Sequence, residues 1–549
     1  MLYLIAGLIA ALFIVLSIRN SRRTREKKTV EQLRASWGKP TAGPFPFERI
    51  EKYATLSGGN EFHRLSKQTL NDIDFLELFA FLDRTTSKIG QQFLFHQLLH
   101  PTNDPQKLGL LNERVDLFAT KTTLREEVQK EILRLSGPDA YFVASLLGKR
   151  MLEKPTWFLF LYVNVIAVIL LVALSFVYPV AVIYLLFPVT GNMLAHYWNK
   201  NNTFLFLKSF PQLSILIDVS EKLVRKNIFQ TDKSVTESID AIKPFQWKMG
   251  LLGLSQDGSI KDDLNQLATY FIELLKACFA VEIFAIFHLT KELEAKEHNI
   301  RILFNYIGTI DGAISIASLR ASDVTTCVPQ WMSTKKEIIG KQMYHPLIKN
   351  CVKNDLHVNG RSILITGSNM SGKTTFLRTI TINSILAQTI CTCFADNLQL
   401  PMLRQFSSIR IDDNLLEGKS YYYEEVNTMG SLIREALSFQ NLFLLDEVFK
   451  GTNTVERIAS AKAALSYLNK GGNIVIVSTH DLELPGMLQH EFDLYHFSET
   501  VENNHLHFDH KIKAGPLLTG NAIKILEMAN YPAEIIAEAK ELSHTLSST

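Results

Sequence analysis

The feature that most constrains the fold of this chain is a long central stretch without charged side chains. Residues 155–199 contain no Asp, Glu, Lys or Arg, and such a stretch is about twice the roughly 20 apolar residues that a helix needs to cross a bilayer. A turn near Pro179 would divide it into two helices. Trp157 and Trp198 lie close to its two ends, where indole rings prefer the membrane interface. We therefore predict a transmembrane hairpin over residues 157–198 with both ends on the same side; a hydrophobic core hairpin of a soluble protein is the alternative.

A second apolar segment opens the sequence. Residues 1–18 carry no charge, and 18 helical residues span about 27 Å, close to the thickness of the hydrocarbon core. Residues 19–28 follow with six basic side chains and one Glu, a pattern retained on the cytoplasmic side of a membrane. A signal peptide, the rival interpretation, would carry its charge before the apolar core and a cleavage site after it. We predict a transmembrane anchor at 1–18 and a basic linker at 19–59, with the functional domains in the cytosol at the inner (cytoplasmic) membrane.

The overall composition excludes several classes of protein. Lys and Arg number 57 and Asp and Glu 55, which leaves a net charge of +2 and no strong overall electrostatic footprint for nucleic acid. Hydrophobic residues make up 47%, too many for a disordered chain. The five cysteines are few and odd in number, so no disulfide framework is predicted and a reducing compartment is favoured.

A phosphate-binding loop is predicted between residues 361 and 382. RSILIT at 361–366 is short, apolar and rich in β-branched residues, as expected of a strand, and GSNMSGKTTFLRTI becomes helical beyond its glycines. The loop fits G-x-x-x-x-G-K-[ST], in which backbone N–H groups surround phosphates at the positive end of the helix. Lys373 is expected to reach the β- and γ-phosphates of ATP, and Thr374 to ligate Mg²⁺. The predicted ATP-binding residues are Gly367, Ser368, Asn369, Met370, Ser371, Gly372, Lys373, Thr374 and Thr375.

Two further strand ends complete the predicted nucleotide site. NLFLLDE at 441–447 predicts an apolar strand that ends in two acids. Asp446 can hold the Mg²⁺ shell, and Glu447 can orient or deprotonate the water that attacks the γ-phosphate. NIVIVS at 473–478 predicts a third strand, and His480 follows it at the end where open α/β sheets bind ligands. We interpret His480 as a γ-phosphate sensor; a purely structural histidine is the alternative. The predicted catalytic residues are Glu447, Lys373 and His480.

Three motifs occur in the same order as in one known family. ITGSNMSGKTTFLR resembles the T-G-x-N-M-x-G-K-[ST] phosphate loop of the MutS family, LLDEVFKGTNT its D-E-x-x-x-G-T-x-T segment, and STHD its strand-end T-H dipeptide. GKQMYHPLI at 340–348 and DIDFLELFAFLDRTTSKIGQQFLFHQLLHPTND at 72–104 are similar to the starts of its ATPase and core helical domains. The resemblance covers roughly residues 60–150 and 250–549.

The resemblance implies a homodimeric ATPase in which a loop from one subunit completes the site of the other. EGKSYYYEEVNTM at 417–429 occupies the position of that loop, and Gly418, Ser420 and Glu425 match it. Ser420 would then be the residue that acts in trans on the γ-phosphate; a helix start with aromatic packing is the alternative. Residues 514–549 resemble the helices that clasp the partner subunit, although ordinary core packing would explain their periodicity equally well.

Other expectations concern DNA. Mismatch-reading members of the family insert a Phe-x-Glu wedge from an N-terminal domain, which we expect this chain to lack. Residues 75–77 and 271–273 fit the three letters, but both lie in predicted helical runs. Residues 261–300 predict one long helix, similar to the lever of the family.

Together these features predict a multidomain α and α/β protein. It would have an N-terminal membrane anchor, an α-helical core and lever domain interrupted by the membrane hairpin, and a C-terminal P-loop ATPase of the ABC-like type. The remaining expected domains are the two parts of the helical core at 60–150 and 200–339, the ATPase domain at 340–513 and dimerisation helices at 514–549. The predicted function is ATP-dependent DNA binding of the mismatch repair type, in which ATP binding and hydrolysis clamp a membrane-tethered dimer on DNA. The alternative is a membrane-bound ATPase switch that acts on a protein or membrane partner without DNA.

Overall fold

The structure is a computed structural model. It describes residues 19–21, 23–24, 26–56, 61–148, 152, 154–229, 233–253, 263–333, 336–368, 370–410, 421–481, 483–502, 505–517, 522–528 and 531–548. The protein is a mixed α/β chain with mostly helical content. It divides into two compact units: unit 1 contains Met1–Gly59, Asp83–His96 and Arg114–Ala321, and unit 2 contains Asn60–Leu82, Gln97–Glu113 and Ser322–Thr549. The anchor predicted at 1–18 lies outside the described residues.

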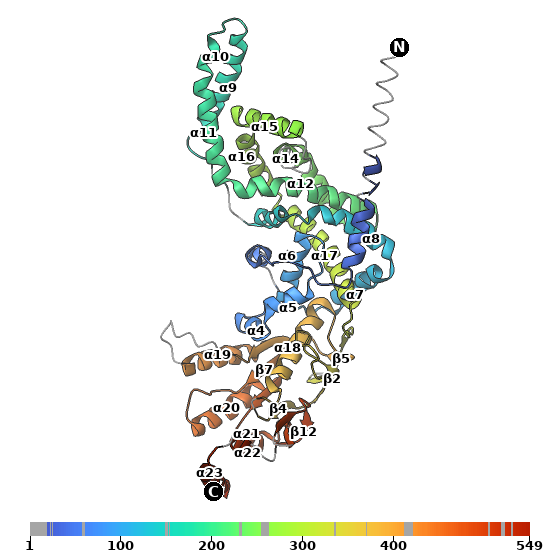
Figure 1. Cartoon of the computed structure of the whole chain (residues 1–549), viewed down its shortest axis with the longest axis vertical. Helices are drawn as coiled ribbons and strands as arrows, with labels where there is room; N and C mark the ends of the chain where they lie inside the picture. Colours follow the sequence, from blue (N-terminus) through green and yellow to red (C-terminus); the bar gives the residue numbers. More distant parts are fainter. Residues whose placement is uncertain are drawn as a thin grey trace. The chain divides into compact units, whose positions relative to one another are not determined.

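Unit 1 is helical in its described part (Figure 1). The chain passes from one unit to the other within α6 (Lys88–Leu99) and α7 (Pro105–Thr120). The other elements of unit 1 are α2 (Phe47–Ile50), α3 (Lys52–Leu56), α8 (Thr122–Ile132), η1 (Leu133–Leu135), η2 (Pro138–Leu147), α9 (Phe158–Ser175), α10 (Ala181–Tyr184), α11 (Leu186–Asn202), α12 (Phe204–Arg225), α13 (Lys233–Ile242), η3 (Lys243–Phe245), α14 (Gln246–Gly253), α15 (Asp263–Cys278), α16 (Val281–Glu294) and α17 (Glu297–Arg320).

The buried helix α17 anchors the core of unit 1. Its apolar side chains, among them Phe304 and Ile307, are fully buried. Asp311 on the same helix accepts hydrogen bonds from the backbone N–H groups of Thr86 (2.9 Å) and Ser87 (2.7 Å), just before α6 begins. The carboxylate therefore satisfies donors at a helix start that would otherwise be buried without a partner. Burial raises the pKa of Asp311 to about 6.

Helices α9 and α11 pack against each other and are joined by the short helix α10, at the position of the predicted transmembrane hairpin (Figure 1). That this hairpin crosses a membrane stays a prediction. The rings of Trp157 and Trp198 lie 4.9 Å apart, so the two ends of the hairpin come together. Within the described residues, α9 and α17 are long and apolar enough to cross a membrane. In the most apolar 18-residue window of α17, 78% of the residues are buried, as in a core helix. The corresponding window of α9 has a mean hydropathy of 2.7, and only 22% of it is buried. Large apolar side chains thus cover the outside of the hairpin.

The single long helix predicted over residues 261–300 is wrong. This segment contains α15, α16 and the first residues of α17. Ala280 has a φ of 50° and ends the first helical run, because a residue in the left-handed region cannot continue a right-handed helix. A hydrophobic pattern with helical spacing cannot reveal such a break when no Gly or Pro marks it.

Unit 2 is an α/β domain built on a six-stranded sheet. The strand order is β12-β9-β4-β8-β7-β6, and all neighbours are parallel except β12 and β9. A smaller sheet has the order β1-β5-β2-β3, and β10 pairs with β11. The strands are β1 (Gln330–Trp331), β2 (Glu337–Met343), β3 (Asn354–Asn359), β4 (Ser362–Thr366), β5 (Asn397–Leu400), β6 (Arg404–Ser408), β7 (Asn441–Asp446), β8 (Ile474–Thr479), β9 (Phe492–His496), β10 (Glu499–Glu502), β11 (His505–Phe508) and β12 (Lys513–Ala514).

Helices cover both faces of the large sheet. The helices that lie wholly in unit 2 are α4 (Lys67–Asp72), α5 (Phe75–Leu82), α18 (Lys373–Ile390), α19 (Tyr421–Glu435), α20 (Thr454–Leu468), α21 (Glu483–Leu488), α22 (Ala522–Met528) and α23 (Ala533–Ser548). Alternate side chains of β4, β7 and β8 pack on α18 on one face and on α19, α20 and α21 on the other. The central strands are buried on both faces, which explains their continuous apolar sequences. Their carboxyl ends meet at one edge, where the predicted motifs lie.

Candidate functional site

The predicted strand and helix on either side of the phosphate loop are confirmed as β4 and α18. Gly367 and Gly372 have φ values of 144° and 113°, which side-chain-bearing residues rarely adopt. A Cβ atom on Gly367 would also lie 2.7 Å from the carbonyl oxygen of Phe497. The two glycines therefore allow a turn that leads directly from the buried strand into the N-terminus of α18.

Lys373 lies at the start of α18 and points back over the loop. Its Nζ donates hydrogen bonds to the carbonyl oxygens of Gly367 (2.6 Å) and Ser368 (2.8 Å). Burial lowers the pKa of Lys373 to about 8, although the nearby carboxylates of Asp446 and Glu447 act in the opposite direction. A buried ammonium group at the positive end of a helix is suited to bind phosphate oxygens.

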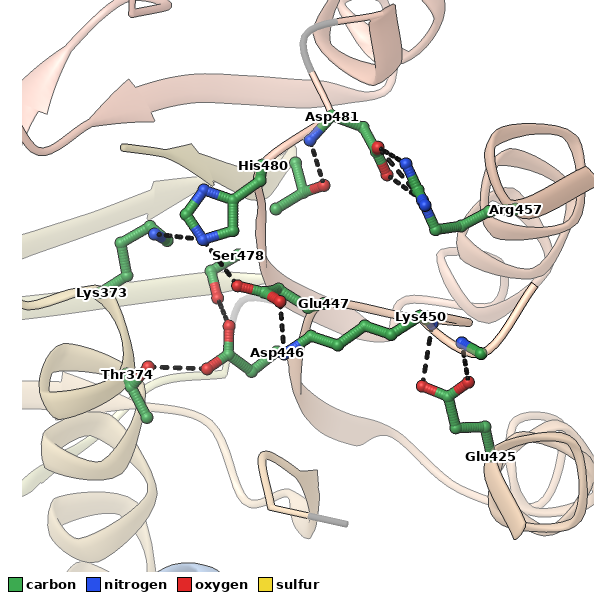
Figure 2. A network of polar contacts seen from close by, with 12 residues as sticks. Lys373, Thr374, Glu425, Asp446, Glu447, Lys450, Arg457, Ser478, His480 and Asp481 are labelled. Atoms are coloured by element: carbon green, nitrogen blue, oxygen red, sulfur yellow. Dashed lines mark hydrogen bonds and ion pairs between the residues drawn. The ribbon is translucent and has the colours of Figure 1, made fainter. Parts of the chain in front are cut away.

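Thr374, in the first turn of α18, and Asp446, the last residue of β7, place two oxygen atoms side by side that could bind a metal. The Thr374 hydroxyl donates a hydrogen bond to Oδ2 of Asp446 at 2.7 Å (Figure 2). The Ser478 hydroxyl, from the neighbouring strand β8, donates to the other carboxylate oxygen. A hydroxyl beside a carboxylate is the donor set that Mg²⁺ prefers, so these two residues fit the predicted metal ligands.

Glu447 follows β7 with a φ of 49°, a conformation that turns its side chain away from the strand direction. Its backbone N–H donates to the carbonyl oxygen of Ser478 at 3.0 Å. Its carboxylate pairs with His480 Nε2 at 2.6 Å and with the ammonium group of Lys450 (Figure 2). Burial acts to raise the pKa of Glu447, but the hydrogen bonds from His480 and Lys450 outweigh it and hold the pKa at about 2. The carboxylate is therefore ionised at neutral pH.

His480 lies between two of the other predicted catalytic residues. Its Nε2 is 2.6 Å from Oε1 of Glu447 and 3.3 Å from Nζ of Lys373. Because Glu447 is ionised, the short contact requires a proton on Nε2, and this nitrogen then cannot also accept a hydrogen bond from Lys373. His480 therefore orients the carboxylate of Glu447 through a hydrogen bond and does not orient Lys373.

Arg457 and Asp481 hold the segment that carries His480. The guanidinium group of Arg457, on α20, donates from Nη2 (2.6 Å) and Nε (3.2 Å) to the Asp481 carboxylate. The backbone N–H of Asp481 donates to the hydroxyl of Thr479 at 3.0 Å. These contacts restrain both neighbours of the histidine (Figure 2).

Glu425 connects α19 to the chain that follows Glu447. Its buried carboxylate accepts hydrogen bonds from the backbone N–H groups of Lys450 (2.9 Å) and Gly451 (3.0 Å) (Figure 2). Gly451 lies so close to α19 that a Cβ atom there would be 2.8 Å from Cβ of Tyr422. Because Lys450 also pairs with Glu447, the position of α19 is linked to the position of the Glu447 carboxylate.

A cavity of 330 Å³ opens beside the phosphate loop. It is lined by residues of α18, including Thr375, by the exposed side chain of Met370 and by His510. His510 Nδ1 lies 3.0 Å from the carbonyl oxygen of Ser371, at the base of the loop. The cavity therefore borders the position where phosphates are expected and has room for a further part of a nucleotide.

The structure brings most of the predicted site residues together. Lys373, Thr374, Asp446, Glu447 and His480 form one network, with the loop residues beside it. Asn369 and Ser420 lie outside the described residues. Sequence reasoning did not identify the roles of the following residues: Lys450, Ser478, Arg457, Asp481 and His510. Lys450, Ser478 and Asp481 had a local signal, because they lie within the motifs LLDEVFKGTNT and STHD.

Comparison with known proteins agrees with this geometry. Residues 363–547 match the family model described as MutS domain V, a region that includes the phosphate loop, the acidic pair and His480. The DNA mismatch repair proteins MutS of Bacillus cereus strains B4264 and Q1 and of Bacillus thuringiensis strain Al Hakam are each 29% identical over 296 residues. Residues 363–547 therefore contain a domain that is similar to domain V of the MutS family.

The likeness to these MutS proteins covers only part of them. The aligned region is 52% of this chain and 33% of each relative, so the chain matches about a third of the length of these curated relatives. Members of the MutS family are ATPases. The network at the carboxyl ends of β4, β7 and β8 lies inside the matched region, in the MutS ATPase domain.

Proposed function

We propose that unit 2 binds and hydrolyses ATP. The observation that carries this proposal is the network at the ends of three adjacent parallel strands, in which Lys373, the Thr374–Asp446 pair and the Glu447–His480 pair face one another. Each member supplies a group that phosphoryl transfer to water requires: a cation for the phosphates, oxygen ligands for a metal, and an oriented carboxylate.

The chemistry assigned to each residue follows from its surroundings. Thr374 and Asp446 would hold Mg²⁺, which when bound neutralises charge on the phosphate oxygens. Lys373 binds the phosphates from the helix side. Glu447 is kept ionised by His480 and Lys450, so it can accept a hydrogen bond from the attacking water and orient it.

Replacement of Glu447 tests this mechanism. Glu447→Gln keeps the size of the side chain but removes its charge, so we expect nucleotide binding to persist while turnover falls by about two to four orders of magnitude. Glu491→Gln, in the same domain but outside the network, is the matched control and should hydrolyse ATP at the normal rate. Undiminished hydrolysis by the Glu447→Gln variant would remove Glu447 from the mechanism.

We further propose that ATP controls DNA binding by a homodimer. The support is that the relatives are named DNA mismatch repair proteins and that residues 363–547 match their ATPase domain. Ser420, just before α19, would act on the γ-phosphate of the partner subunit. The net charge of +2 places any DNA-binding surface on a local basic region, and such binding should weaken with salt because phosphate contacts release counterions.

We also propose that the protein is tethered to a membrane through the hairpin, with residues 1–18 as a second anchor. The support is the exposed apolar surface of α9 and α11, on which Leu170, Phe187 and Leu194 are each more than half exposed. If the chain crosses the membrane an even number of times between residues 148 and 203, the segments before and after the hairpin lie on the same side. That side would be the cytosol, where ATP is present.

The same hairpin favours a second candidate function, a membrane-bound ATPase switch without DNA. Its exposed apolar surface belongs to unit 1, the helical part of the chain, so ATP-driven changes could act on a membrane or protein partner. Salt-dependent binding of duplex DNA separates the two candidates, because only the first requires contacts with phosphates.

A further inference from the structure

In the part of α15 whose side chains are described, residues 270–278, four large apolar side chains are exposed and Lys276 is buried. Tyr270 and Phe271 are 73% and 60% exposed, and Leu274 and Leu275 on the next turn are also exposed. Lys276 of the same helix is only 6% exposed. The four apolar residues are spaced so that they share one face of the helix. This arrangement is the reverse of that of a helix at the surface of a water-soluble domain.

Lys276 and Glu273 of α15 form ion pairs with residues of α16 and α11. Lys276 Nζ lies 3.6 Å from a carboxylate oxygen of Glu282, which is 3% exposed on α16. Glu273 contacts Lys276 at 3.4 Å and Lys200 of α11 at 3.4 Å. Ionised side chains are costly to bury and are accepted inside a helical bundle when they pair with one another. The buried ammonium group of Lys276 is therefore paired within the bundle.

The hairpin beside α15 is inverted in the same way. Asn164 of α9 and Asn192 of α11 are buried, whereas many large apolar residues of these helices are exposed. Asn192 Nδ2 donates a hydrogen bond to the carbonyl oxygen of Cys278 at 2.7 Å, so the end of α15 is attached to α11. Helix α15 lies across α11 rather than along it (Figure 1).

We propose that α15 is a third membrane-contacting element, which lies in the plane of the bilayer beside the hairpin with Tyr270, Phe271, Leu274 and Leu275 against lipid. This proposal rests on the proposed membrane hairpin. An apolar medium outside the helix explains why its apolar residues face outward and why its charges pair inward. A helix that crosses the direction of a transmembrane hairpin lies along the membrane surface, where amphipathic helices and aromatic rings are stable.

The assignment changes the role expected for this segment. Residues 261–300 resemble a lever that would lie in water, near DNA. A helix held at the bilayer surface would instead attach the helical unit to the membrane at a second place, so that the hairpin could not rotate freely about its axis. Protein partners on this face, including a second copy of the chain, are alternatives that the following experiment excludes or reveals.

Spin labels measure the surroundings of α15 directly. Single cysteines replace Phe271 or Leu275 in a full-length variant whose five native cysteines are changed to serine, and the labelled protein is reconstituted in phospholipid vesicles. Leu170→Cys on α9 reports on the hairpin, and Leu110→Cys on α7 is the matched control for an exposed leucine outside it. Collision rates with oxygen and with a neutral nickel chelate are compared, because oxygen concentrates in lipid and the chelate in water.

The proposal predicts that labels at positions 271 and 275 collide preferentially with oxygen, as at 170, with an oxygen-to-nickel ratio several times that at 110. A water-like ratio at 271 and 275 together with a lipid-like ratio at 170 would overturn the assignment of α15 and leave the hairpin in place. Water-like ratios at all four positions would overturn both proposals. Labels at 271 and 275 that neither reagent reaches would mean that protein covers this face, which also overturns the assignment.

A second measurement uses the unmodified chain, so it does not depend on the folding of any variant. Wild-type protein in vesicles that contain a phospholipid with a diazirine on its acyl chain is irradiated, and the labelled peptides are identified by mass spectrometry. We expect adducts within residues 270–275 as well as within α9 and α11. Adducts in the hairpin but none in α15 would contradict the proposal.

Discussion

His480 Nε2 lies 2.6 Å from Oε1 of Glu447, and this contact joins the end of β8 to the residue that follows β7. The histidine N–H donates a hydrogen bond to a carboxylate that is half-buried and ionised. A hydrolytic water requires an oriented carboxylate, and His480 and Lys450 together orient that of Glu447.

Replacement of His480 by Ala should lower the turnover number by about 10- to 100-fold, with little change in the dissociation constant for ATP. The hydrogen bond from His480 lowers the pKa of Glu447, so its loss should raise that pKa from about 2 towards the usual value. The acidic limb of the pH profile of turnover should then move to higher pH. A variant with normal turnover and an unshifted profile would show that His480 is structural.

Glu425 should act as a positioning residue for Glu447. Glu425→Gln leaves one oxygen to accept hydrogen bonds from two N–H groups, Lys450 and Gly451, so the segment that carries Lys450 should become less well placed. We expect turnover to fall by about tenfold, the cost of one such hydrogen bond, while the affinity for ATP stays within twofold. Glu424→Gln on the same helix is the control. Equal effects of the two variants would contradict this role.

Nucleotide affinity should depend on pH through Lys373. Burial lowers its pKa to about 8, so the ammonium form is lost above that pH, and phosphate binding must then be accompanied by proton uptake. The dissociation constant for ATP should be nearly constant below pH 8 and rise above it by up to about tenfold per pH unit. Lys373→Met should bind weakly without this dependence. A flat profile for the wild type between pH 7 and 9.5 would contradict the assignment.

Gly90 should be essential for the core of unit 1. A Cβ atom at this position would lie 2.1 Å from Oδ2 of Asp311, which cannot move without losing its hydrogen bonds to Thr86 and Ser87. Gly90→Ala should therefore lower the free energy of unfolding by about 2–3 kcal/mol. Gly109→Ala, on α7 with nothing within 4 Å of the new methyl group, should raise it by about 0.5–1 kcal/mol. Thermal unfolding of the two variants checks both signs.

Sequence reasoning found the parts of the site that local patterns specify. A strand rich in β-branched residues, a glycine turn and an acidic pair after an apolar strand each follow from a few adjacent residues, and β4, α18 and β7 lie where these patterns predict them. The break at Ala280 has no such pattern, because only tertiary packing places an alanine in a left-handed conformation.

Contacts between distant segments were beyond sequence reasoning. Asp72, at the end of α4, accepts hydrogen bonds from the backbone N–H groups of Ile409 and Arg410 beyond β6, although more than three hundred residues separate them. The hydrogen bonds from Lys450 and Gly451 to Glu425 likewise depend on where α19 packs. Single-sequence periodicity reports which side of an element is buried but not which partner it meets.

The most direct test of the proposed function is fluorescence anisotropy of labelled duplex DNA with the full-length protein in lipid nanodiscs. Homoduplex, mismatched and branched DNA are compared with and without ATP and Mg²⁺ across a salt series, and Glu447→Gln serves to hold the ATP-bound state. We predict that the protein binds DNA and that this binding weakens as the salt concentration rises. We also predict that the affinity for DNA changes when ATP is present. Absence of DNA binding at the lowest salt, in a preparation that hydrolyses ATP, would contradict the DNA-clamping account and favour the membrane switch.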